Sequence, residues 1–153
     1  MRLTIKNRWC TGNLKRTQIE KYKKKYKGCE IVEYVGIAAD EPKRVKDKRY
    51  PLVEWGVTEK QALEYCYKHG FNWDGLYNHF NRLSCWCCPL SNLKELKILW
   101  KDFPKLWNKL KEWEGQSIGQ FRTDYSIPEL EKKFACEERG EKYKKEKSSV
   151  LSK

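Results

Sequence analysis

Three cysteines lie within four positions of the stretch SCWCCPL, at Cys85, Cys87 and Cys88. A single buried thiol packs as a small hydrophobic group, but clustered thiols are typical of metal or redox chemistry. Cys85 and Cys88 have the C-x-x-C spacing, which directs two thiolates at one metal in zinc and iron–sulfur sites. Such sites need four ligands, and Cys87 could supply a third if the backbone turns sharply. The sequence therefore predicts a metal site that recruits a ligand from elsewhere.

The remaining ligand must come from a distant part of the chain, and Cys10, in RWCTG, is the best candidate. Cys29 and Cys66 fall in a predicted strand and on an amphipathic helix face, where inert core thiols are expected. His79, six residues before Cys85, is an alternative ligand if the metal is zinc.

Composition limits the class of protein. The chain has 153 residues, a net charge of +12 and 14% aromatic residues, which fits one domain with a sizeable core. A basic balance favours acidic partners such as nucleic acid or nucleotides. The sequence has no apolar run near 18 residues and no segment like a signal peptide, so we expect a cytoplasmic protein with reduced thiols. The seven cysteines are an odd number, so they cannot all pair within the chain.

Hydrophobic periodicity predicts the elements that must position these thiols. Helices are expected over residues 16–28, 58–70, 91–103, 103–113 and 126–138. The six basic residues of 16–28 form either a solvated face or a phosphate-binding patch. The β-branched run CEIVEYVGI (29–37) predicts a buried strand, and PLVEWGV (51–57) a short extended segment. The tail over residues 137–153 is charged, without apolar period, and is predicted to be disordered.

Four motifs occur in a familiar order along the chain. They are RWCTGNLK (8–15), VGIAADEPKR (35–44), YPLVEWGVTEKQALEYCYKHGF (50–71) and GLYNHFNRLSCWCCPL (75–90). Together they resemble the C-terminal half of the phosphoadenosine phosphosulfate reductase family, within the adenine nucleotide α-hydrolase-like (PP-loop) superfamily. The chain is most similar to the phage and bacterial branch with W-C-T-x-x-L-K and C-W-x-C, which includes the iron–sulfur subunit of DNA phosphorothioation systems. The resemblance is strongest over residues 7–115 of a portion that we place at 1–136.

This resemblance implies an α/β fold: a partial adenine nucleotide α-hydrolase-like (Rossmann-like) fold with few strands and a helical C-terminal region. In the family's iron–sulfur reductases, a Cys-Cys pair is followed by a lysine near the cluster and substrate. Cys10 matches the first cysteine and Lys15 the lysine, whereas Thr11 replaces the second cysteine. The later C-x-x-C matches the cysteine stretch, in which Cys87 is additional and could supply the missing thiolate. The resemblance thus implies a 4Fe–4S cluster, with zinc as the alternative; its predicted ligands are Cys10, Cys85, Cys87 and Cys88.

The segment GIAADEPKR is similar to the family's sulfate- or phosphate-contacting loop. Arg44 matches the closing arginine of that loop, whose planar fork suits oxyanions, while Ala38 replaces the inner arginine. The resemblance implies an adenine nucleotide or sulfonated nucleotide as substrate. The residues predicted to bind its anionic group are Lys15, Arg44, Arg8 and Lys43.

Two family features are missing. No S-G-G-x-D-S nucleotide loop is present, and Cys136, the candidate catalytic thiol, lacks the family's glycine and histidine neighbours and an adjacent cation. We therefore expect the cluster-bearing portion of a phosphoadenosine phosphosulfate reductase-like protein of sulfur metabolism. It would be of oxidoreductase or sulfurtransferase type and inactive alone, acting with a PP-loop-bearing chain or self-associating. The alternative is a zinc-stabilised basic module that binds nucleic acid without catalysis.

Overall fold

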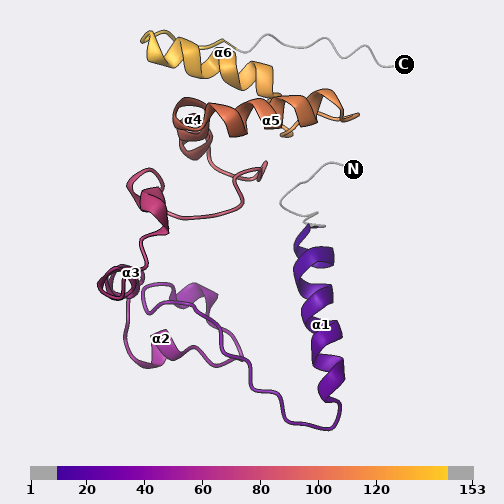
Figure 1. The fold of residues 1–153 in the computed structure, drawn as a ribbon, viewed down its shortest axis with the longest axis vertical. Helices are drawn as coiled ribbons and strands as arrows, with labels where there is room; N and C mark the ends of the chain where they lie inside the picture. Colours follow the sequence, from indigo (N-terminus) through magenta and orange to yellow (C-terminus); the bar gives the residue numbers. More distant parts are fainter. Residues whose placement is uncertain (1–9, 145–153) are drawn as a thin grey trace. The chain divides into compact units, whose positions relative to one another are not determined.

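The computed structural model describes residues 10–144, and these form two compact units. The N-terminal unit is Cys10–His79, and the described part of the second, here called the helical unit, is residues 80–144. Figure 1 shows the elements of both units in chain order. Among the helices of residues 10–144, none combines the length and apolar content that crossing a membrane requires.

The N-terminal unit begins with a continuous helical segment of three kinds of turn. A π-helical stretch, Thr11–Arg16, leads into α1, Thr17–Lys23, and a 3₁₀ turn, Lys24–Tyr26 (Figure 1). The chain leaves the helix at Gly28, whose φ of +91° lies in the left-handed region that glycine adopts without a steric cost. The helix predicted over 16–28 is confirmed and starts earlier than expected.

The predicted strand over 29–37 is not formed, and the α/β fold prediction is wrong. Tyr34 and Arg49 make only an isolated parallel bridge, in which the Val35 N–H donates to the Arg49 carbonyl at 2.9 Å. A β-branched run favours extended backbone, but a strand also needs a neighbouring strand with which to form a ladder. No segment of residues 10–144 supplies one, so the described chain is helical and not a partial Rossmann-like fold. The predicted burial also fails, because Ile31 and Val32 are exposed.

Two α-helices and two 3₁₀ segments follow in the N-terminal unit. Their bounds are Pro42–Arg44 (3₁₀), α2 at Pro51–Glu54, α3 at Glu59–Lys68, and a 3₁₀ segment at Trp73–Asn78. The α3 helix is confirmed, with the predicted capping box between Thr58 and Gln61. The extended segment predicted over 51–57 is wrong, because Pro51 takes the first position of a helix, where its fixed φ fits and its missing N–H costs nothing.

The helical unit contains α4 (Leu93–Asp102), α5 (Pro104–Gly115) and α6 (Ile127–Glu138), close to the predicted ranges. Helix α5 packs against both α4 and α6 (Figure 1). The core buries one stripe from each helix, and its members are Leu96, Leu99, Trp107, Leu110, Ile127, Leu130 and Phe134. Helix α6 ends at Glu138, inside the range predicted as a disordered tail, and residues 145–153 of that range lie outside the described residues.

Candidate metal centre

The three clustered cysteines lie in a sharply turning segment that precedes α4, here called the cysteine turn (residues 85–91). The Cys88 N–H donates to the Cys85 carbonyl at 3.0 Å, and the Ser91 N–H donates to the Cys88 carbonyl at 3.1 Å. Cys85 is exposed and Cys88 is half-buried. None of the seven cysteines, all of which lie within residues 10–144, is paired in a disulfide bond. The backbone therefore turns between Cys85 and Cys88 as a C-x-x-C ligand pair requires.

Two side chains of the cysteine turn pack against the helical core. Trp86 and Cys87 both contact the core cluster, and the Trp86 ring lies 5.3 Å from the Trp113 ring of α5. These contacts hold one side of the turn on the helices. They give Cys87 a packing role, and its proposed role as a third ligand stays a prediction.

The thiols of the cysteine turn are ligands of a type that soft metals prefer, but fewer ligands are brought together among the described residues than a metal site needs. Two free thiols at C-x-x-C spacing suit zinc or an iron–sulfur cluster. However, no group of three or more cysteine, histidine, aspartate or glutamate side chains within residues 10–144 is arranged to hold a metal ion. Cys10 and His79 belong to the N-terminal unit, so their parts in the site stay predictions.

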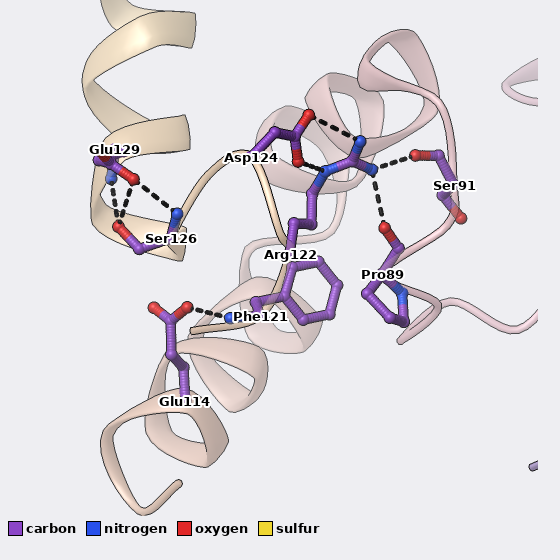
Figure 2. Close-up of polar contacts among 8 residues, drawn as sticks. All are labelled: Pro89, Ser91, Glu114, Phe121, Arg122, Asp124, Ser126 and Glu129. Atoms are coloured by element: carbon purple, nitrogen blue, oxygen red, sulfur yellow. Dashed lines mark hydrogen bonds and ion pairs between the residues drawn. The ribbon is translucent and has the colours of Figure 1, made fainter. Parts of the chain in front are cut away.

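Arg122 holds the other side of the cysteine turn (Figure 2). Its Nη1 donates to the carbonyls of Pro89, at 2.8 Å, and Ser91, at 2.6 Å. Its Nε and Nη2 donate to the Asp124 carboxylate at 2.7 and 3.1 Å. The hydrogen bond from Arg122 lowers the pKa of Asp124. Arg122 was not predicted from the sequence, because the residues adjacent to it do not indicate that it binds backbone carbonyls about thirty residues upstream.

Glu114 fixes the loop that carries Arg122, here called the 116–125 loop. Its carboxylate accepts hydrogen bonds from the Phe121 N–H, drawn in Figure 2, and from the Ile127 N–H at 2.8 Å. Just after the loop, Ser126 and Glu129 form the capping box that begins α6 (Figure 2). The loop is thus held from the end of α5 and at the start of α6.

The predicted anion-binding residues lie in the N-terminal unit, apart from Arg8, which is outside the described residues. Lys15, in the π-helical stretch, and Lys43 are exposed. Arg44 already has a carboxylate partner, since its Nη1 donates to both Glu41 oxygens at 2.5 and 2.7 Å. That hydrogen bond raises the pKa of Arg44. An incoming anion would have to compete with Glu41, and anion binding stays a prediction.

Cys136 is half-buried near the end of α6 and, contrary to the expectation above, has a cationic neighbour. The Arg139 Nη2 donates to the Cys136 Sγ at 3.5 Å. The same guanidinium donates to the Glu141 carboxylate at 2.8 and 3.1 Å, and these bonds raise the pKa of Arg139. The expectation that no cation lies beside Cys136 is therefore wrong, while its catalytic role stays a prediction.

Comparisons with known proteins give one distant relative. No family model matches the chain, and no solved structure matches it. The chain is 25% identical over 123 residues to uncharacterized protein MJ0066 of Methanocaldococcus jannaschii, a match that covers 71% of this chain. The chain spans about a quarter (25%) of the length of that relative.

Proposed function

We propose that this chain is the cluster-bearing portion of a phosphoadenosine phosphosulfate reductase-like protein of sulfur metabolism. Cys85 and Cys88 supply two thiolates to a 4Fe–4S cluster, and Cys10 and Cys87 are the further ligands. The observation that carries the proposal is the tight turn between Cys85 and Cys88, with free thiols and a packed support. The four motifs that resemble the reductase family link this thiolate pair to sulfur chemistry.

The nucleotide-binding half is proposed to lie outside these 153 residues, because they contain no S-G-G-x-D-S loop. The exposure of large apolar side chains in the N-terminal unit supports this proposal, since surfaces of this kind commonly mark interfaces. Most of the length of the distant relative lies outside the match, so a protein similar to this chain carries further segments.

Metal content tests the proposal. Protein purified without oxygen should be brown and contain about four iron and four sulfide ions per chain, as expected of a 4Fe–4S cluster. Replacing Cys10, Cys85, Cys87 or Cys88 singly by serine should remove most of the iron and lower the thermal stability, because metal binding and folding are coupled. Cys29→Ser is the matched control, since Cys29 is an exposed cysteine outside the set. A metal-free wild-type protein would refute the proposal.

A second candidate is a zinc-stabilised module that binds nucleic acid. The helical segment Thr11–Tyr26 favours it, because that segment has no buried residue and residues 16–28 carry six basic side chains against one acidic one. A colourless protein with zinc in place of iron, and salt-sensitive binding to a nucleic-acid oligomer, would support this function over the first.

A further inference from the structure

Arg122 connects the cysteine turn to the loop before α6 through one planar group. Two of its contacts are the carbonyls of Pro89 and Ser91, and Pro89 is buried and follows Cys88 directly. Only the N and Cα atoms of Pro89, whose φ is fixed by its ring, separate the Pro89 carbonyl from Cys88, so anchoring this carbonyl limits the movement of the Cys88 backbone. The side chain of Arg122 is only 16% exposed, so these contacts are largely shielded from competing water.

The contacts need the shape of a guanidinium as well as its charge. Arginine presents five N–H donors in a rigid fork, whereas lysine carries a compact ammonium on a flexible stem. Here the fork reaches two carbonyls with Nη1 and a carboxylate with Nε and Nη2. A lysine cannot reproduce this set of directions.

The cysteine turn is held independently on its other side. Trp86 packs against Trp113, and Cys87 contacts the core, without any part played by Arg122. Loss of Arg122 should therefore loosen the end of the turn at Cys88 while the helical core stays folded.

We infer that Arg122 is a positioning residue that sets how the Cys85–Cys88 pair presents its thiols to a metal. The metal part of this inference rests on the proposed function, but the positioning of the thiols does not. Residues that orient metal ligands without touching the metal typically change metal affinity about 10- to 100-fold when they are replaced.

Cobalt binding is the first measurement, with Co²⁺ titrated under anaerobic conditions and followed by its thiolate charge-transfer absorption. Arg122→Met and Arg122→Lys should both weaken binding about tenfold or more relative to the wild-type chain. Arg82→Met is the matched control, since Arg82 is exposed and lies three residues before Cys85. Wild-type affinity in both Arg122 variants would overturn the inference for metal binding.

Thiol alkylation is the second measurement and does not depend on any metal. Iodoacetamide should modify Cys88 about tenfold faster or more in Arg122→Met, because the loss of hydrogen bonds to a charged group loosens the Cys88 end of the turn. Cys136, half-buried on α6, is the internal reference for global unfolding. An unchanged rate at Cys88, or an equal increase at Cys88 and Cys136, would overturn the inference. A wild-type chain that binds no metal but shows the selective increase would refute the proposed function and leave the positioning role standing.

Discussion

The ion pair between Arg122 and Asp124 links acid stability to the loop that holds the cysteine turn. Arg122 lowers the pKa of Asp124 in the folded state by donating a hydrogen bond to its carboxylate. A carboxylate of this kind contributes stability above its unfolded pKa, and that contribution is lost as the pH falls through its folded pKa.

We expect Asp124→Asn to lower the free energy of unfolding at neutral pH. Below about pH 4, the difference in unfolding free energy between the two proteins should shrink as the pH falls. Urea unfolding of the two proteins at pH 7 and at steps down to the acid limit checks this. An equal difference at every pH would show that ionisation of Asp124 is not the cause.

Some residues of the candidate site could be predicted from the sequence, and others could not. Cys85 and Cys88 could be predicted, because two thiols at this spacing share one turn in many surroundings. Arg122 could not be predicted, because it binds backbone carbonyls 33 and 31 residues away. Every residue has a backbone carbonyl, so the sequence does not show which ones an arginine will bind. Arg139 lay within reach of prediction, since it is three residues from Cys136 at the end of a helix.

At the scale of elements, the helices of the helical unit follow from their apolar stripes and their caps. Leu96, Leu99, Trp107 and Leu110 recur at helical spacing and are all buried. The segment 29–37 has an equally clear local preference, yet it forms no strand, because a ladder depends on a partner outside the segment. The sequence pattern therefore predicted the helices, whose hydrogen bonds are local. It failed for the strand, which needs a second strand to pair with.

We expect Trp107→Ala to cost about 3–5 kcal/mol of unfolding free energy, since truncating a buried aromatic side chain leaves a cavity. Trp107 is 2% exposed and contacts Phe134 of α6 at a ring distance of 6.1 Å. Chemical denaturation followed by circular dichroism measures the change. Trp55→Ala is the control, because Trp55 is 71% exposed and its loss should change stability by less than about 0.5 kcal/mol. Similar costs for both variants would contradict the assignment of the core.

At the scale of the whole molecule, apolar side chains are distributed unevenly. Thirteen of the fifteen large hydrophobic side chains that are exposed among the described residues belong to the N-terminal unit. The buried hydrophobic residues of that unit are Ile37, Ala38 and Tyr50, against seven in the helical unit. The N-terminal unit therefore has little core of its own to bury its apolar side chains.

We expect the isolated chain to self-associate or to bind a hydrophobic dye, and to show no reductase turnover with phosphoadenosine phosphosulfate. The physical reason is the exposed apolar surface, together with the missing pyrophosphate cradle that would orient a nucleotide. Sedimentation, dye fluorescence and a reductase assay, each with and without a polypeptide carrying S-G-G-x-D-S, measure these properties. A dye-silent monomer that reduces the nucleotide unaided would contradict both expectations.

The hydrogen bonds of Arg122 also affect how readily a protease can cleave the helical unit. Arg122 is the one lysine or arginine in the 116–125 loop, so it is the one position there where trypsin could cut. Trypsin must draw the arginine side chain into its own acidic pocket, but this guanidinium is already bound to Asp124 and to two carbonyls. Glu114 also holds the loop backbone through the Phe121 N–H. We therefore expect trypsin to cleave the 116–125 loop poorly, although the loop contains an arginine.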